Sequence, residues 1–275
     1  MLQSDIQLVA IDLDGTLLDD NKRIPSETVS VIHEIIRQGI RVTVASARTF
    51  GSVLPYARQL GTETPLITFA GAYVADIRQK QILVKKPLNL PKMKEVVALL
   101  QERDYYIKVY APDRLLVQEV TEETIEFSQR YGVPYEAVGR GRLSALKDAP
   151  FRIVLLDEPE RIQEARRMLE PWEEVFYFSQ DTDRGLEITD ATVNKGAALG
   201  AICREFAIPF AKVMAIGNEG NDIEMIRQAG IGVAMANACE ELKQCADVVT
   251  KSNEERGVEW ALRQYVLNSN GSVGQ

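Results

Sequence analysis

Polar side chains that could bind a phosphate and a cation follow apolar segments at four places in this chain. The first group, Asp12-Leu13-Asp14-Gly15-Thr16, comes directly after an apolar run. Two carboxylates this close repel each other, and a divalent cation such as Mg²⁺, which prefers oxygen ligands, would remove that conflict. The other groups are Ser46-Ala47-Arg48, Lys195, and 217–222 with Asn218, Asn221 and Asp222. Carboxylates, a hydroxyl, backbone amides and a lysine are the groups that phosphoryl transfer requires.

Strand-like and helix-like segments alternate around the first two groups. The predicted strands are Leu8–Leu13, Ile40–Ala45 and Pro65–Phe69, the predicted helices are Ser26–Arg37 and Thr49–Leu60, and a hairpin follows over Tyr73–Val84. This alternation predicts a parallel sheet with right-handed crossovers. Ligands bind at the carboxyl ends of such strands, so we expect the polar groups to converge on one rim of the sheet.

The middle of the chain has a different pattern, which begins after a break at Pro87, Asn89 and Pro91. The predicted elements there are an amphipathic helix Lys92–Glu102, paired strands Tyr106–Ala111 and Leu115–Glu119, a helix Pro159–Trp172, and strands Val175–Ser179 and Gly185–Ile188. Repeated helix–strand–strand order predicts an antiparallel sheet with helices on one face, an α+β module.

The last part returns to the first pattern. Its predicted elements are helices Lys195–Phe206 and Asp222–Ala229, strands Val213–Ile216, Ile231–Ala234 and Val248–Val249, a helix ending the segment Ser252–Leu267, and a frayed tail, Asn268–Gln275. We therefore expect an α/β fold, a Rossmann-like parallel-sheet core formed by residues 1–85 and 191–275. An inserted α+β cap domain is expected over residues 86–190.

The four polar groups, in this order, resemble the four motifs of the haloacid dehalogenase-like (HAD) phosphatases. The matching patterns are Asp-x-Asp-Gly-Thr-Leu-Leu, Ser-x-Arg, a helix-opening lysine and Gly-Asn-x-x-Asn-Asp. The insertion resembles the type II cap of the Cof-type sugar phosphatases, and the resemblance continues to Val248–Asn253 and Gly257-Val258. It implies a Mg²⁺-dependent hydrolase of small phosphorylated metabolites, sugar phosphates above all, which acts through an aspartyl-phosphate intermediate.

The resemblance also assigns a role to each matching position. Asp12 matches the nucleophile, and Asp14 matches the acid that protonates the leaving group and then activates water as a base. The positions that match the phosphate-binding groups are Ser46, Lys195, Asn221 and the amides of Leu13 and Ala47, with Arg48 facing the substrate. The positions that match the Mg²⁺ site are Asp12, Asp14 through its carbonyl, Asn218, and Asp222 beside them.

Three positions depart from the family pattern. Asn218 stands where aspartate is usual, Ala47 where glycine is usual, and Ala70 where asparagine is common. An uncharged Asn218 should weaken Mg²⁺ binding. Two other functions therefore stay open: a phosphosugar mutase, and a phosphometabolite-binding protein with little catalysis. Without the family match, Asn218, Asn221 and Asp222 would be an ordinary polar turn, and Arg48 could pair with a surface carboxylate.

Composition limits the partners and the compartment. The net charge of −8 argues against nucleic acid or an anionic membrane as a general partner, but not against a small phosphorylated metabolite. No apolar run approaches the ~20 residues of a membrane helix. Three cysteines without a CxxC pair indicate a reducing compartment, so a cytoplasmic protein is expected. His33, the only histidine, is far in sequence from every motif, and the sequence gives no oligomeric state.

Overall fold

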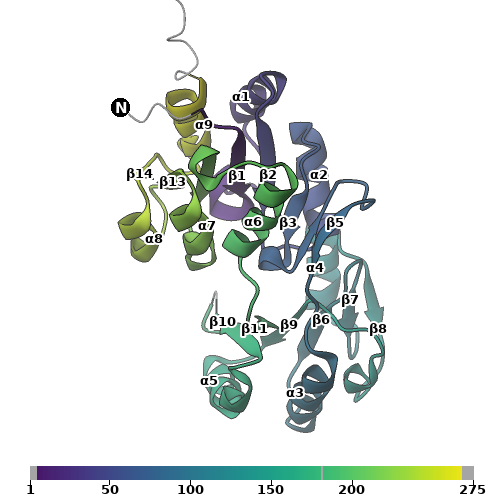
Figure 1. The fold of residues 1–275 in the computed structure, drawn as a ribbon. Coiled ribbons are helices and arrows are strands. Elements are labelled where there is room, and N and C mark those ends of the chain that lie inside the picture. The colour runs from purple at the N-terminus through teal and green to yellow at the C-terminus, as the bar shows by residue number, and fades with distance from the viewer. Residues whose placement is uncertain (1–4, 181, 268–275) are drawn as a thin grey trace, which may run out of the picture. The chain divides into compact units, whose positions relative to one another are not determined.

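The computed structural model describes residues 5–180 and 182–267, so the predicted tail over 268–275 lies outside the described residues (Figure 1). The chain forms two compact units. The core unit comprises Met1–Arg48, Val53–Val84 and Asn194–Gln275, and the inserted unit comprises Thr49–Ser52 and Lys85–Val193. The predicted α/β class with a parallel-sheet core is confirmed.

The sheet of the core unit has the strand order β14-β13-β12-β1-β2-β3-β4-β5. Its pairs are parallel from β14 to β3, and β4 is antiparallel to β3. The strands are β1 Leu8–Asp12, β2 Arg41–Ala45, β3 Leu66–Thr68, β4 Tyr73–Ala75, β5 Ile82–Lys85, β12 Val213–Gly217, β13 Ile231–Ala234 and β14 Val248–Val249. Because β1, β2 and β12 run in parallel, the residues that follow them leave the sheet at the same edge.

The helices of the core unit are α1 Ser26–Arg37, α2 Phe50–Leu60 from Val53 on, α6 Lys195–Glu205, α7 Ile223–Gln228, α8 Glu240–Cys245 and α9 Gly257–Leu262. Helix α1 starts just after Pro25 and buries Thr28, Val31, Ile32 and Ile35, the spacing of one helix face. All five residues of β1 are buried, as expected for a central parallel strand with both faces covered. Pro55 lies inside α2.

The sheet of the inserted unit has the order β10-β11-β9-β6-β7-β8. Its elements are α3 Leu90–Glu102, β6 Ile107–Tyr110, β7 Leu115–Val117, α4 Glu122–Tyr131, β8 Tyr135–Ala137, β9 Arg152–Leu156, α5 Pro159–Met168, β10 Phe176–Ser179 and β11 Gly185–Asp190. Strands β8 and β9 were not predicted, and β9 is central. The expected antiparallel sheet is in fact mixed, because β7 and β8 are parallel.

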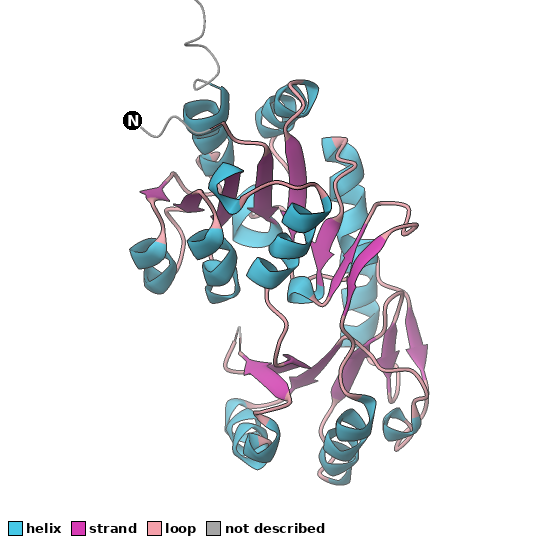
Figure 2. Ribbon diagram, viewed as in Figure 1, coloured by secondary structure: helices cyan, strands magenta, loops and turns pink. Residues whose placement is uncertain are grey.

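Helices lie on both faces of this sheet, so the prediction of one covered face was wrong (Figure 2). Ile107 and Val109 of β6 belong to an apolar cluster that includes residues of α3 and α5. Lys108 and Tyr110 alternate with them and so point to the opposite face, where the Tyr110 ring packs 6.0 Å from Phe127 of α4. In residues 5–180 and 182–267, no helix is long and apolar enough to cross a membrane.

Candidate active site

A buried lysine joins two carboxylates that lie far apart in the sequence. Asp12 is the last residue of β1, Lys195 is the first residue of α6, and Asp222 immediately precedes α7. Lys195 Nζ donates to Asp12 Oδ1 at 2.7 Å and to Asp222 Oδ1 at 2.6 Å. The three side chains are at most 7% exposed. The structure therefore brings three of the predicted site residues into one hydrogen-bonded cluster, which we call the lysine cluster.

The lysine cluster perturbs the charges of its members. Burial and the negative charge of Asp222 raise the pKa of Asp12 from 3.8 to about 7, although Lys195 opposes the shift. Burial alone would lower the pKa of Lys195, but the two carboxylates raise it above its usual value. Lys195 is thus a permanent cation that neutralises part of the acidic charge. Strongly perturbed groups of this kind are typical of functional sites.

Both carboxylate oxygens of Asp222 already have partners. Oδ1 accepts from Lys195, and Oδ2 accepts from the backbone amides of Asn218 at 3.0 Å and Glu219 at 3.1 Å. The carboxylate fits here because β12 ends in Gly217, where a Cβ would lie only 2.6 Å from Asp222 Cγ. Asp222 therefore holds Lys195 and the loop that carries Asn218.

The side chain of Asn218 lies between Asp12 and the turn that follows it. One of its amide atoms lies 3.1 Å from Asp12 Oδ2, 3.1 Å from the Asp14 carbonyl oxygen and 3.0 Å from Thr16 Oγ1. Gly15 makes room for it, since a Cβ on Gly15 would lie 2.5 Å from Asn218 Nδ2, and the φ of +72° at Gly15 favours glycine as well. The Asp12–Thr16 motif and Asn218 therefore form one packed arrangement.

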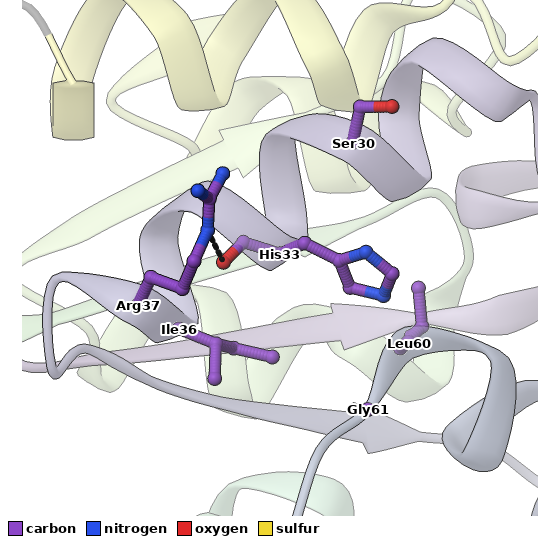
Figure 3. Close-up of a pocket in the computed structure, with 6 residues that line it drawn as sticks. All are labelled: Ser30, His33, Ile36, Arg37, Leu60 and Gly61. Atoms are coloured by element: carbon purple, nitrogen blue, oxygen red, sulfur yellow. Dashed lines mark hydrogen bonds between the residues drawn. The ribbon is translucent and has the colours of Figure 1, made fainter.

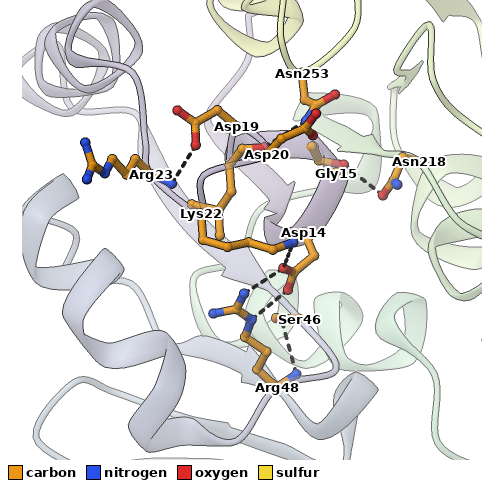
Figure 4. Close-up of polar contacts among 12 residues, drawn as sticks. Asp14, Gly15, Asp19, Asp20, Lys22, Arg23, Ser46, Arg48, Asn218 and Asn253 are labelled. Atoms are coloured by element: carbon orange, nitrogen blue, oxygen red, sulfur yellow. Dashed lines mark hydrogen bonds and ion pairs between the residues drawn. The ribbon is translucent and has the colours of Figure 1, made fainter. Parts of the chain in front are cut away.

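A second charged cluster surrounds Asp14, whose side chain is 40% exposed (Figure 4). Arg48 donates from Nε to Oδ2 at 2.7 Å and from Nη2 to Oδ1 at 2.6 Å, and Lys22 Nζ donates to Oδ1 at 3.1 Å. Burial opposes the shift, but the bonds and charges of Arg48 and Lys22 lower the pKa of Asp14. The Tyr56 hydroxyl donates to the Lys22 carbonyl and so helps to hold this segment.

The remaining predicted phosphate-binding residues lie at strand ends or helix starts. Ser46 follows β2, is 2% exposed, and its Oγ accepts from the Arg48 amide at 3.1 Å. The Leu13 amide donates a hydrogen bond to the Asp12 carboxylate. Ala47 lies between Ser46 and Arg48 and is partly exposed. Asn221 is exposed in a short turn of helix, Gly220–Asp222. Their predicted roles in phosphate binding stay predictions.

The oxygen atoms around Asn218 have the chemistry of a Mg²⁺ site. Asp12 Oδ2 and the Asp14 carbonyl oxygen each lie 3.1 Å from one atom of the Asn218 amide, so in one orientation of that amide three oxygens gather, and Mg²⁺ prefers oxygen ligands. Among the described residues, no three His, Cys, Asp or Glu side chains could hold a metal by themselves. The donor set therefore fits a hard cation in kind, but it supplies little charge.

Residues outside the four motifs complete the site. Asn237 Nδ2 donates to the Gly15 carbonyl at 2.8 Å, and Asn253 Nδ2 donates to the Leu18 carbonyl at 3.1 Å (Figure 4 labels Asn253). These two side chains, from the loops before α8 and α9, hold the turn after Asp12. Lys22 was also missed, because a single lysine in a polar loop gives no sequence signal.

A separate hollow opens between α1 and the end of α2, lined by Ser30, His33, Ile36, Arg37, Leu60 and Gly61 (Figure 3). His33 Nε2 lies 3.1 Å from the Gln59 carbonyl oxygen, so the histidine joins α1 to α2. The lining contains no carboxylate. His33 accordingly has a packing contact, and this hollow lacks the carboxylates that a cation and a nucleophile would need.

Comparisons with known proteins agree with this geometry. The sequence pattern of the haloacid dehalogenase-like hydrolases matches residues 9–262. The 5-amino-6-(5-phospho-D-ribitylamino)uracil phosphatase YitU of Bacillus subtilis is 29% identical, covering 94% of this chain and 97% of that protein. The stress response protein YhaX of B. subtilis is 31% identical, covering 94% of this chain and 93% of that protein. A crystal structure from Thermotoga maritima, TM0651, superposes with a TM-score of 0.85 at 27% identity, covering 94% and 97%.

Proposed function

The chain belongs to the haloacid dehalogenase-like hydrolases and is a phosphatase of their Cof type, and on that premise we propose that it hydrolyses small phosphorylated metabolites at Asp12 through an aspartyl-phosphate. The observation that carries this proposal is the lysine cluster. A carboxylate at the end of a central strand, held by a buried lysine, has the position and support that a nucleophile needs.

In the first step, Asp12 attacks the phosphorus atom and displaces the alcohol of the substrate. Lys195 fixes one oxygen of Asp12, so the attacking carboxylate keeps its orientation. Ser46, Lys195 and the amides of Leu13 and Ala47 donate to the phosphate oxygens, where negative charge must be stabilised. When Mg²⁺ is bound by Asp12, the Asp14 carbonyl and Asn218, the chemistry that it supplies is neutralisation of charge on the phosphoryl group.

Asp14 handles the protons of both steps. An anionic substrate that draws Arg48 and Lys22 away from Asp14 raises its pKa again, so Asp14 can hold the proton that it donates to the leaving alkoxide. In the second step it accepts a proton from the water that attacks the aspartyl-phosphate. Arg48 and Lys22 hold its carboxylate in one place. The same two cations attract an anionic phosphate, so Arg48 is the residue that we assign to the substrate as well as to Asp14. Asp222 acts by positioning Lys195 and Asn218.

We assign the substrate to the phosphate monoesters of sugars and sugar alcohols. The similar protein YitU is named as a phosphatase of a ribityl phosphate, which supports this class. The test is phosphate release from a panel of sugar phosphates, sugar-alcohol phosphates, nucleotides and cofactor phosphates, with and without Mg²⁺. We expect Mg²⁺-dependent release from at least one sugar or sugar-alcohol phosphate, and a loss of at least about a thousandfold in Asp12→Asn.

The matched control is Asp113→Asn, which makes the same change at a side chain that is 71% exposed in the inserted unit. It should keep wild-type release. Full activity in a folded Asp12→Asn would contradict the mechanism. An isomerised sugar phosphate in place of free phosphate would indicate a mutase. Binding of the panel without release by the wild type would indicate a phosphometabolite-binding protein.

A further inference from the structure

The amide of Asn218 meets a carboxylate oxygen and a carbonyl oxygen, which accept hydrogen bonds or bind a cation, and the hydroxyl of Thr16, which can also donate. One amide atom lies 3.1 Å from both Asp12 Oδ2 and the Asp14 carbonyl oxygen. With oxygen at this position, Thr16 Oγ1 donates to it at 3.0 Å, but its lone pairs repel those of Asp12 Oδ2 and of the Asp14 carbonyl oxygen. With the amide turned by 180°, the nitrogen lies within hydrogen-bond distance of both of them and of Thr16 Oγ1 at 3.0 Å, and its two hydrogens can bond Asp12 Oδ2 and the Asp14 carbonyl oxygen. Hydrogen bonding therefore favours the nitrogen when no cation is present.

The carboxylates of the lysine cluster and of the Asp14 cluster are already paired with cations. Three carboxylates, Asp12, Asp14 and Asp222, contact three cations, Lys22, Arg48 and Lys195. A divalent cation binds most tightly where uncompensated carboxylates surround it, since its affinity depends on the number of charged ligands. Here the cations in contact neutralise the carboxylates, and Asn218 adds an oxygen without a charge.

An aspartate at position 218 would behave differently in the absence of a cation. Its carboxylate would face Asp12 Oδ2 and the Asp14 carbonyl with no proton to donate, so repulsion would disturb the turn. Asparagine avoids this because its amide offers a donor in one orientation and an acceptor in the other.

We propose that Asn218 is a two-way ligand: its amide nitrogen ties Asp12 to the Asp14 carbonyl when no divalent cation is bound, and its amide oxygen replaces the nitrogen when a cation enters. The site then stays ordered without the cation and binds the cation weakly. This inference rests on the proposed function only for the identity of the site, since it concerns order and cation binding and not turnover.

The test compares wild type, Asn218→Asp and a control, Gln59→Glu, which makes the same charge change on an exposed position of α2. Thermal unfolding is measured in EDTA and in Mg²⁺, and Mg²⁺ affinity by calorimetric titration. In wild type and in the control, we expect a small change of Tm on adding Mg²⁺. In Asn218→Asp, we expect a lower Tm in EDTA, a larger rise with Mg²⁺, and at least about tenfold tighter Mg²⁺ binding.

The proposal is overturned if wild type and Asn218→Asp show the same Mg²⁺ affinity and the same change of Tm. If Asn218→Asp does not fold in either condition, the Tm of Asn218→Ala in EDTA tests the proposal instead. It removes the donor, so its Tm in EDTA should fall below that of the wild type, and an unchanged Tm would overturn the proposal. Phosphate release by the wild type is measured separately, so this inference can fail while the phosphatase assignment stands.

Discussion

The two units of the molecule each bury a lysine, but they surround it differently. In the core unit, Lys195 is 1% exposed, and its partners Asp12 and Asp222 are 7% and 0% exposed. In the inserted unit, Lys108 is 2% exposed, but its partner Glu123 is 55% exposed. Lys108 also lies near aromatic rings, with Nζ 5.1 Å from the centre of the Phe127 ring.

This difference distinguishes the arrangement to which we assign the chemistry from one that supports a fold. Glu123 can keep its water, so the Lys108 pair involves desolvation of only one partner. The lysine cluster removes three charged groups from water at once, a costly arrangement that stability alone does not require. Its result is a carboxylate, Asp12, with a raised pKa and a fixed orientation. Such an arrangement is expected where function, and not stability, selects the residues.

The largest predicted difference comes from replacing each lysine by methionine. Lys195→Met leaves two buried carboxylates without their cation, which should lower the free energy of unfolding by about 3–5 kcal/mol. Lys108→Met leaves Glu123 in water, and the loss should stay within about 1 kcal/mol. The chain has two tryptophans, Trp260 in α9 and Trp172 in the inserted unit.

Urea unfolding followed by Trp260 fluorescence in a Trp172→Phe background reports the core unit. The converse background, Trp260→Phe, reports the inserted unit. Equal losses in the free energy of unfolding for the two lysine variants, each measured in its own unit, would contradict the contrast between the lysine cluster and the Lys108 pair.

A smaller difference is expected between two glycines with left-handed backbone, Gly15 in the core unit and Gly132 after α4, with φ of +72° and +64°. Alanine at either position should cost about 1–2 kcal/mol through the backbone. At Gly15 the new Cβ also meets Asn218 Nδ2 at 2.5 Å, whereas nothing lies within 4 Å at Gly132. Overpacking should add about 1–3 kcal/mol to Gly15→Ala.

The same fluorescence assays measure both glycine variants, and phosphate release provides a second reading. Gly15→Ala should lose most of its activity because Asn218 and Asp14 are displaced, and Gly132→Ala should keep it. If Gly15→Ala and Gly132→Ala lose similar stability and both keep their activity, glycine at position 15 is needed only for the backbone conformation of the turn.

The smallest predicted effect is a pH dependence of stability, which arises at Tyr110 in the inserted unit. Burial raises the pKa of Tyr110 to about 12, so the folded state keeps this proton more tightly than the unfolded state does. Its contribution to the free energy of unfolding is therefore complete below pH 10 and is lost as the pH rises towards 12. The loss amounts to about 1.4 kcal/mol at pH 11. Tyr110→Phe should show a correspondingly smaller decrease in stability between pH 9 and pH 11 in urea unfolding. An identical decrease in both proteins would contradict this assignment.

The sequence predicted the core unit more closely than the inserted unit, for a physical reason. The bounds of α1, β13 and β14 agree with the prediction, because their apolar patterns have clear limits. Strand β9 was missed because Ile153–Leu156 is continuously apolar, and such a run cannot be assigned to a strand or a helix by periodicity. The position of α4 depends on contacts across the sheet, which no local pattern encodes.

For the candidate site, the sequence indicated which residues lie together at the edge of the sheet, but not which of their atoms are in contact. Strand ends predicted that Asp12 and the group at 217–222 would meet. The contacts of Arg48 and Lys22 with Asp14 depend on loop conformations, such as the left-handed backbone of Lys22 with a φ of 61°. The contact between Asn218 and Asp12 depends on the space that Gly15 leaves. These features are set by tertiary structure.

The most direct test of the central claim, that Asp12 is the nucleophile, uses Asp14→Asn with 4-nitrophenyl phosphate. Nitrophenolate leaves without a proton, so the first step should proceed while the second lacks its base. We predict a burst of one nitrophenolate per enzyme, followed by slow turnover. Mass spectrometry after acid quenching should then find phosphate on the peptide that contains Asp12. No burst and no phosphorylated Asp12 peptide, with a wild type that hydrolyses the same ester, would contradict the account.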